Sequence, residues 1–366
     1  MKIIQIADTN LSENEINAAI KVLRSGQFRQ GPECEMFEKD FAKKVGAKCA
    51  VTSANGSTAL HLAYMTFLKP GEEVLVPSFT FIATASMVAM AGGKPVFCDV
   101  DPETFLLDLK DAERKITART RAISPVHLFG NPCDVDAVCA FAKKHNLKVV
   151  WDAAQAHGAT FKGRDVGSFG DFVGYSFYPT KNLFVGEGGM TCCADSEADA
   201  LMRHLRSHGQ TGKYIHTILG HNFRMTDVEA AIGREQLKRL DEMLSTRRRN
   251  AEILNSGFAK IPGVAPQKIT QGGVSVWHQY CATIDKEKLG IDRDTLMERL
   301  KEKGITTGVH YPRGLHQQPI FEDMYGKSAL PVTESLTERI IALPVHHALS
   351  AEDAERIVQA VRESVK

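Results

Sequence analysis

Over residues 48–195, short apolar runs rich in β-branched residues alternate with longer segments of helical periodicity. The apolar runs are typical of strands buried on both faces, and the helical segments are typical of connections between parallel strands. The apolar runs span residues 48–54, 73–78, 94–100, 121–130, 147–154, 172–178 and 190–195, and the helical segments span residues 57–68, 81–92 and 134–145. This order predicts an α/β domain with a largely parallel sheet and helices on both faces.

The flanking segments complete the predicted domain organisation. Ser12 followed by Glu15 is a capping box and predicts a first amphipathic helix. The long charged stretch of residues 226–258 predicts a helix that leads into a smaller unit with short strands. We therefore expect a large α/β domain over residues 1–245 and a small α+β domain over residues 246–366.

The charge and hydropathy of the chain argue against several classes of protein. Lys and Arg number 45 against 44 Asp and Glu, without charged blocks, so nothing indicates a nucleic-acid partner. No run approaches the roughly 18 apolar residues that a membrane span needs. The N-terminus lacks the basic region and long apolar stretch of a signal peptide. We expect a cytoplasmic protein with neither a nucleic-acid nor a membrane partner.

The eight cysteines form no CxxC pair and have no His-rich partner segment. In a chain of this size, such a scatter is typical of reduced core residues and not of a disulfide or zinc framework. The sequence therefore predicts no metal site.

The segment SANGSTALHLAY places Asn-Gly-Ser-Thr between a predicted strand and a predicted helix. Free N–H groups and the helix dipole at such a position form an anion site, and a glycine lets the backbone approach the anion. The alternative is a glycine turn capped by a serine, without a ligand. No Gly-Lys-Ser/Thr follows, so this is not a Walker loop. Gly56 and Ser57 are candidate phosphate-binding residues.

Asp152 ends a buried-looking apolar run and is followed by Gln155. A carboxylate there is costly unless it meets a cation or a strong donor. Asp152 is therefore a candidate partner for the protonated nitrogen of a heteroaromatic ring, with Gln155 as a neutral donor nearby. The alternative is a helix cap, and a ribose clamp is disfavoured because no GxGxxG precedes the residue.

Lys181 lies in the segment SFYPTKNLFVGEGGM, whose proline and glycines exclude a helix and a central strand. The polar and flexible residues around it suit the lip of a cavity, where desolvation lowers the pKa of a lysine so that it attacks a carbonyl. A plain surface lysine is the alternative. An anion site, an acid for a ring nitrogen and a nucleophilic lysine together describe one cofactor, pyridoxal phosphate. Two interpretations stay open for Glu187, a cap of the turn, which we favour, or a residue near the donor's path.

The ordered motifs resemble the sugar aminotransferases of the DegT/DnrJ/EryC1/StrS family over nearly the whole chain. The motifs that carry the resemblance include SANGSTAL, VPSFTFIATASMVAMAGGKPVFCDVD, VHLFGNPCD, WDAAQAHGA, YSFYPTKNLFVGEGGM, GHNFRMTDVEAAIGREQL and HYPRGLHQQP. The resemblance implies the aspartate aminotransferase fold (fold type I) of pyridoxal-phosphate-dependent transferases. That fold has a large domain with a mostly parallel seven-stranded sheet and a small α+β C-terminal domain.

The resemblance also implies roles for residues around the cofactor ring. Lys181 would form a Schiff base with pyridoxal phosphate and move protons during transamination. Asp152 would pair with the ring nitrogen, and Gln155 would contact the ring hydroxyl. Phe81 would stack on the ring face; the alternative is a core residue of an apolar helix. Trp151 departs from the family, which more commonly has an acid before the aspartate, so the strand end is expected to pack differently behind the ring.

Further residues are assigned by the same resemblance. The phosphate would be bound by Gly56, Ser57 and Ser176. Asn222 resembles the asparagine that reaches the phosphate from the other subunit, which implies a homodimer with shared active sites. His310 and Tyr311 are the candidates for substrate contact.

The resemblance implies transfer of an amino group from an amino acid, with L-glutamate as the expected donor, to a keto group of a nucleotide-linked deoxysugar. Such a reaction serves the biosynthesis of amino sugars for polysaccharides, including lipopolysaccharide O-antigen, or for glycoconjugates. A cyclitol or a keto sugar without a nucleotide is the alternative substrate. A non-catalytic regulatory protein on the same fold is the alternative class, and the presence of Lys181 argues against it. Family members with histidine in place of the lysine catalyse dehydration, so Lys181 favours transamination.

Overall fold

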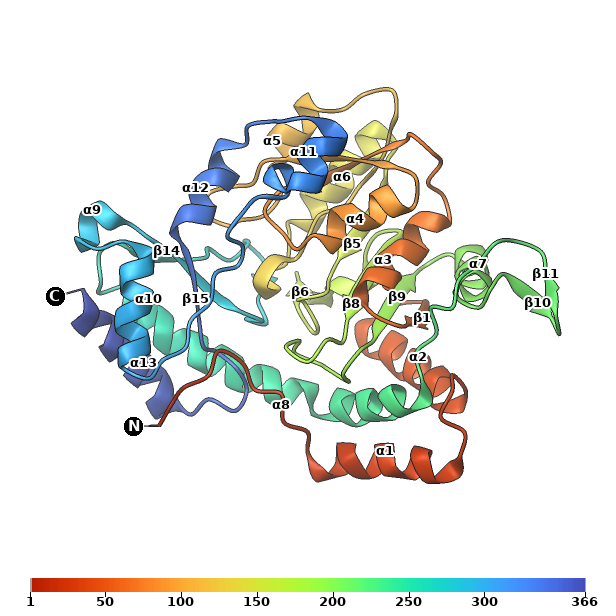
Figure 1. The fold of residues 1–366 in the computed structure, drawn as a ribbon, viewed down its shortest axis with the longest axis horizontal. Helices are drawn as coiled ribbons and strands as arrows, with labels where there is room; N and C mark the ends of the chain where they lie inside the picture. The colour runs from red at the N-terminus through yellow and green to blue at the C-terminus, as the bar shows by residue number, and fades with distance from the viewer. Residues whose placement is uncertain (1, 366) are drawn as a thin grey trace.

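A seven-stranded sheet forms the centre of the computed structural model, which describes residues 2–365 (Figure 1). The strand order is β1-β9-β8-β5-β4-β2-β3, and only β9 runs antiparallel to its neighbours. The strands are β1 (Cys49–Ser53), β2 (Glu73–Pro77), β3 (Lys94–Cys98), β4 (Thr120–Ile123), β5 (Lys148–Asp152), β8 (Phe172–Ser176) and β9 (Gly189–Cys193). The predicted α/β class and mostly parallel sheet are confirmed.

Helices cover both faces of this sheet. The face with α3 (Gly56–Met65), α4 (Ala83–Met90) and α7 (Ser196–Arg206) has a core of its own, to which Val74 and Val76 contribute. On the other face, Leu75 joins the core shared with α2 (Pro32–Val45), α5 (Leu109–Arg114) and α6 (Val135–His145). Successive strand residues point to opposite faces, so a strand that is covered on both sides must be apolar throughout. This is why β2 reads as a continuous apolar run.

One apolar run is shorter as a strand than its sequence predicts. Of residues 121–130, only those up to Ile123 belong to β4, and Leu128–Gly130 form a 3-10 turn. Pro125 has no N–H to give to a sheet, and Phe129 adopts a positive φ of 61°. The regular strand therefore ends at Ile123, although Val126 still forms an isolated bridge with Asp152 before the chain enters the loops above the sheet.

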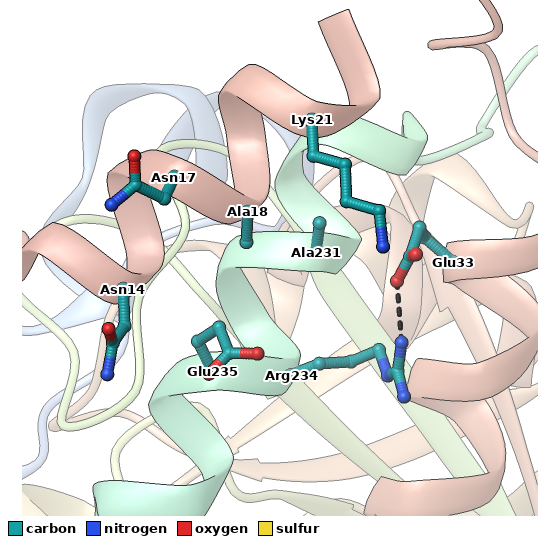
Figure 2. Close-up of a pocket in the computed structure, with 8 residues that line it drawn as sticks. All are labelled: Asn14, Asn17, Ala18, Lys21, Glu33, Ala231, Arg234 and Glu235. Atoms are coloured by element: carbon teal, nitrogen blue, oxygen red, sulfur yellow. Dashed lines mark hydrogen bonds and ion pairs between the residues drawn. The ribbon is translucent and has the colours of Figure 1, made fainter. Parts of the chain in front are cut away.

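The N-terminal helix α1 (Glu13–Ser25) packs with α2 along the long helix α8 (Asp227–Phe258), as Figure 1 shows. The Glu15 carboxylate accepts from Arg239 Nη1 at 2.9 Å and from the Ser12 N–H at 2.6 Å, so the Glu15 half of the predicted capping box is formed. These three helices enclose a small polar cavity of about 330 Å³, in which Arg234 pairs with Glu33 at 2.7 Å (Figure 2). The ion pair ties α8 to α2.

A second sheet and core lie toward the C-terminus. The antiparallel strands β12 (Val264–Pro266), β14 (Tyr280–Ile284) and β15 (Ile340–Leu343) pack with the helices α10 (Arg293–Glu302) and α13 (Ala351–Ser364). The last turns of α8 enter this core through Leu254 and Phe258. The boundary expected at residues 245 and 246 falls inside α8, and the division into two domains stays a prediction.

Smaller elements complete the fold. They are β6 (Thr160–Phe161), β7 (Arg164–Asp165), β10 (Gln210–Gly212), β11 (Ile215–His216), β13 (Gly273–Val274), α9 (Lys286–Leu289), α11 (Pro319–Tyr325) and α12 (Pro331–Arg339). Each of the eight cysteines, all within the described residues, carries a free thiol. Within residues 2–365, no helix is both long and apolar enough to span a bilayer.

Candidate active site

A cavity of about 660 Å³ opens where the parallel strands β2, β4, β5 and β8 end. Ligands of open α/β sheets bind at this edge because the loops and helix N-termini after the strands converge there. The cavity is lined by the predicted residues Gly56, Ser57, Phe81, Asp152, Gln155, Ser176, Lys181, His310 and Tyr311. Nine residues proposed from separate motifs therefore share one cavity.

The loop after β8 presents Lys181 to this cavity. The Lys181 N–H donates to the Tyr178 carbonyl at 2.8 Å, which closes a tight turn. The next residue anchors the loop, since Asn182 Nδ2 donates to the Val276 carbonyl at 3.1 Å. Burial lowers the pKa of Lys181 to about 8, although the negative charge of Asp152 opposes this shift. The amine is therefore neutral far more often than an ordinary lysine at neutral pH.

Asp152 lies at the last position of β5 with its carboxylate in the cavity. Thr84 Oγ1 donates to Oδ2 at 2.7 Å, and the Ala154 N–H donates to Oδ1 at 3.0 Å. Burial raises the pKa of Asp152, while these donors and Lys181 act against the rise. A buried carboxylate that is held in this way fits a protonated ring nitrogen, because the cation offsets the cost of desolvation.

Gln155 has a fixed amide orientation. Its Oε1 accepts from the Phe129 N–H at 2.7 Å, and its Nε2 donates to the Tyr311 hydroxyl at 3.0 Å. Since the carbonyl side is taken by the backbone and one N–H by Tyr311, the amide has one N–H left to donate to a ligand in the cavity. This arrangement fits an oxygen on a ring, such as the hydroxyl of pyridoxal phosphate.

The anion site predicted after β1 is formed by the first turn of α3. Asn55 caps this helix by accepting from the Thr58 N–H at 2.9 Å, which leaves the N–H groups of Gly56 and Ser57 without a partner in the helix. A Cβ at Gly56 would lie 2.5 Å from the Cβ of Ser176. Only glycine permits this close approach, which brings the helix start and the Ser176 hydroxyl together. A phosphate group fits such a cup.

Phe81 lies between β2 and α4, and its side chain is 55% exposed. Its ring centroid is 6.4 Å from that of Tyr311, which also lines the cavity. Phe81 is therefore not a core residue, and its exposed face is available to a planar ligand.

Three further predictions concern residues in or near the site. Trp151 is fully buried and stacks on His127 at 4.9 Å between ring centroids, on the side of β5 away from Asp152. Asn222 is exposed and is not among the described residues that line the cavity, although it pairs with Ser207. Glu187 lines the cavity, while the role as a cap stays a prediction.

Sequence reasoning missed some residues that line the cavity or support its lining residues. Thr84 is one helical turn after Phe81, but nothing in the sequence indicates that its hydroxyl contacts a strand end. His278 comes from the C-terminal half, and its Nδ1 lies 3.3 Å from Asn182 Oδ1. Burial holds the pKa of His278 well below its usual value, with Lys181 acting in the same direction. A neutral imidazole therefore borders the amine of Lys181.

Comparison with known proteins places this geometry in one family. The DegT/DnrJ/EryC1/StrS aminotransferase family matches residues 9–362. A "Pleiotropic regulatory protein" of Geobacillus stearothermophilus is 39% identical over 94% of this chain and 92% of its own length. The dTDP-3-amino-3,4,6-trideoxy-alpha-D-glucose transaminase of Streptomyces venezuelae is 38% identical over 95% of this chain and 92% of its own. The crystal structure of S. venezuelae DesV in complex with a ketimine intermediate aligns with a TM-score of 0.92 at 36% identity, covering 96% of this chain and 94% of that one.

The fold and the site thus define an aminotransferase of fold type I. The chain belongs to the DegT/DnrJ/EryC1/StrS aminotransferase family. Enzymes of this family depend on pyridoxal phosphate, and the cavity residues described above fit that cofactor.

Proposed function

We propose that this enzyme transfers an amino group from an amino acid, with L-glutamate as the expected donor, to a keto group of a nucleotide-linked sugar. The observation that carries the proposal is the shared cavity of Lys181, Asp152 and the anion cup at Gly56. The similarity to a dTDP-sugar transaminase supports the sugar substrate. The amino sugar would serve polysaccharide or glycoconjugate biosynthesis in the cytoplasm.

The cavity residues divide the task of holding the cofactor. When bound, pyridoxal phosphate supplies an electron-withdrawing ring that accepts the electrons left when the α-proton departs. The residues that would hold it are Lys181 at the aldehyde, Asp152 at the ring nitrogen, Gln155 at the ring hydroxyl, Phe81 on the ring face, and Gly56, Ser57 and Ser176 at the phosphate. His310 and Tyr311 are left for substrate contact.

Within this arrangement, Lys181 and Asp152 act on protons. Asp152 keeps the ring nitrogen protonated, because its buried negative charge favours a cation beside it. The amine of Lys181 takes a proton from the carbon that bears the donor's amino group and returns one during the second half of the reaction. A pKa of about 8 suits both directions of transfer near neutral pH.

Two alternatives stay open. A cyclitol or a keto sugar without a nucleotide would use the same chemistry. The similarity to a relative named "Pleiotropic regulatory protein" is the reason to consider a regulatory role. A regulator, however, has no need of a lysine and an aspartate placed as Lys181 and Asp152 are.

A substrate screen tests the proposal. Purified enzyme loaded with pyridoxal phosphate is mixed with L-glutamate and a panel of nucleotide-linked keto sugars, keto sugars without a nucleotide, and keto cyclitols. Release of 2-oxoglutarate beyond one equivalent per active site is expected only with nucleotide-linked sugars, because glutamate alone aminates the bound cofactor once. Turnover of the unlinked compounds alone would support the alternative substrates, and no turnover with any amino donor would favour the regulatory role.

The lowered pKa of Lys181 predicts how the cofactor-free enzyme captures pyridoxal phosphate. Only the neutral amine attacks the aldehyde, so the capture rate is expected to rise with pH and to level off above about 8. A lysine near its usual pKa of 10.5 would show a rate that keeps rising past pH 9. Stopped-flow absorbance of the lysine-bound cofactor measures the profile, and borohydride reduction followed by peptide mapping identifies the lysine.

We also propose that two chains form a homodimer with shared active sites. The hairpin of β10 and β11 projects from the body of the molecule (Figure 1). The hairpin carries the exposed apolar side chains of Tyr214 and Ile215, and the segment after it carries that of Leu219. Asn222 follows this hairpin and lies outside its own chain's cavity. An apolar projection of this kind is typical of a surface that packs against a partner. Asn222 would then complete the phosphate site of the partner.

Complementation between two inactive variants tests the shared site. Asn222→Ala and Lys181→Ala subunits are mixed, dissociated and reassociated. Each hybrid dimer is expected to contain one site with both native residues, so activity returns to roughly a quarter of wild type in a one-to-one mixture, since half the dimers are hybrids. An activity no greater than the sum of the two separate variants would show that Asn222 acts within its own chain.

A further inference from the structure

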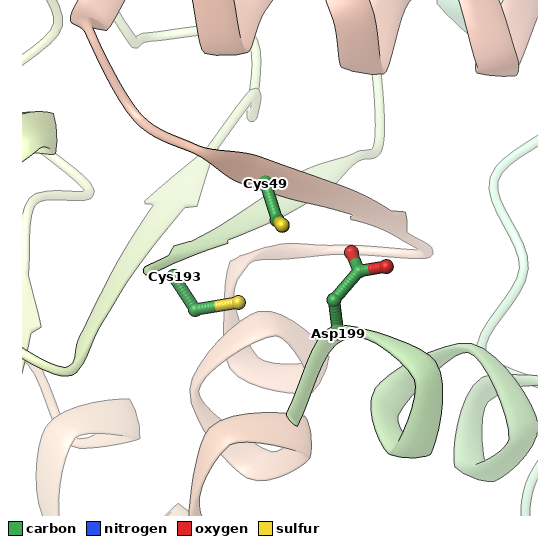
Figure 3. Close-up of side chains that lie close together, drawn as sticks. All are labelled: Cys49, Cys193 and Asp199. Atoms are coloured by element: carbon green, nitrogen blue, oxygen red, sulfur yellow. The ribbon is translucent and has the colours of Figure 1, made fainter. Parts of the chain in front are cut away.

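Three potential metal ligands meet far from the cavity, at the opposite end of β1 and β9. Cys49 begins the edge strand β1, and its register partner on β9 is Cys193. Asp199 lies in the first turn of α7, above the same two strands. Figure 3 shows the two thiols and the carboxylate pointing toward one another. Their ligand atoms all lie within 4.8 Å of each other.

We propose that Cys49, Cys193 and Asp199 form a structural site for a thiophilic divalent cation, with Zn²⁺ as the probe. Two sulfur ligands and one oxygen ligand suit Zn²⁺, which is bound at about 2.3 Å by sulfur and about 2.0–2.2 Å by oxygen. Tetrahedral bonds of these lengths separate the ligand atoms by about 3.5–3.8 Å. The ligand atoms, at most 4.8 Å apart, therefore need to approach one another by no more than about 1.3 Å, and water completes the fourth position.

The surroundings of Asp199 favour this role. Its two oxygens accept from Arg203 at 2.9 and 3.1 Å, and each oxygen keeps a second lone pair for a metal. Arg203 is held in turn by Glu38 at 2.6 Å and by the Ala50 carbonyl at 2.9 Å. Metal-bound carboxylates are commonly oriented by such a second hydrogen-bond partner. Two thiolates and a carboxylate exceed the charge of the ion by one, which the guanidinium of Arg203 balances.

The position of the site predicts that a bound cation would stabilise the anion cup at Gly56. Cation binding joins the edge strand β1 to β9 and α7 at one end, and releases the two thiol protons to solvent. The other end of β1 leads directly to Asn55 and Gly56. A bound cation at this edge would fix the start of β1, the strand that leads to the anion site, and would not contact any reacting atom.

Metal analysis of the purified protein tests the proposal. After dialysis in reducing, metal-free buffer and one addition of Zn²⁺, the wild type is expected to retain about one zinc ion per chain. Cys49→Ser and Cys193→Ser are expected to retain none. Asp199→Asn removes a ligand, so its zinc affinity is expected to fall by more than the roughly tenfold that loss of an outer-shell partner costs a metal site. Cys139→Ser is the matched control, because Cys139 is a half-buried cysteine on α6 outside the cluster.

Each other outcome overturns the proposal. Equal zinc content in all variants would mean adventitious binding, and no zinc in the wild type would mean no site. Addition of Cd²⁺ to folded wild type provides a second measurement, because cadmium bound to thiolates absorbs in the ultraviolet. Absence of that band, or a Cys49–Cys193 disulfide detected by mass spectrometry in the same reducing buffer, would likewise overturn it. Cofactor binding, followed separately by absorbance, keeps this test independent of the proposed reaction.

Discussion

Lys181→Ala is expected to abolish transamination. Loss of a positioned acid or base alone lowers a rate by about a hundredfold to ten-thousandfold, and this variant should lose at least that much. The physical reason is twofold. The variant lacks the amine that would bind the cofactor aldehyde, and it lacks the group that moves the proton at the reacting carbon. The cavity should still bind the cofactor and a substrate noncovalently, because Asp152 and the cup at Gly56 are intact. Turnover of glutamate with the accepted sugar, together with cofactor content after dialysis, measures both effects.

The control for this variant is Lys110→Ala, which removes an exposed lysine from α5. That protein is expected to keep full activity and to be labelled by borohydride at Lys181. Unchanged activity in Lys181→Ala would remove the lysine from the mechanism. Loss of activity accompanied by a cooperative loss of thermal stability would instead mean a role in folding, so melting curves of both variants accompany the assay.

Asp152→Asn is expected to lower the rate by about a hundredfold to a thousandfold, comparable to the loss of one preorganised electrostatic partner. The affinity for pyridoxal phosphate should fall much less, since the phosphate cup and Lys181 remain. The negative charge of Asp152 raises the pKa of Lys181, so its removal should also move the pH profile of cofactor capture to lower pH. Rate, cofactor affinity and the pH midpoint are measured on the same protein.

The matched control is Asp136→Asn, a change at an exposed carboxylate paired with Lys162. It should leave all three quantities unchanged. An upward shift of the pH midpoint in Asp152→Asn would contradict the electrostatic effect of Asp152 on Lys181. A loss of affinity as large as the loss of rate would argue that Asp152 acts in binding alone. Thr84→Val separates orientation from charge, because it removes a donor to Asp152 while the carboxylate stays in place.

Most of the large sheet follows from local pattern. The seven apolar runs correspond to seven strands because burial on both faces leaves a continuous apolar signature that needs no long-range information. The run that includes Pro125 was too long, since the point at which a strand leaves a sheet depends on its neighbours. The strand order, with β9 reversed between β1 and β8, is a property of packing that alternation alone does not encode.

The candidate site likewise has residues that the sequence predicts and contacts that only the structure shows. Residue type and position after a strand were sufficient to select Lys181, Asp152 and Gly56, because their chemistry is unusual in such places and because the motifs resemble a known family. Three features could not be predicted from the sequence. They are the contact between Thr84 and Asp152, the position of His278 in the cavity wall, and the 2.5 Å approach to Ser176 that forbids a side chain at Gly56. Each joins segments that are distant in the chain.

The cysteines illustrate a contact that spacing along the chain does not predict. Spacing along the chain predicted no metal site, because Cys49 and Cys193 share no motif. The antiparallel register of β1 and β9 sets them side by side, and α7 adds Asp199. The sequence by itself determined most of the strands and helices and the chemical identity of the candidate cofactor-binding residues, since these depend on local periodicity and residue type. Only the tertiary structure decided which side chains meet, because strand order and register bring together residues that chain spacing keeps apart.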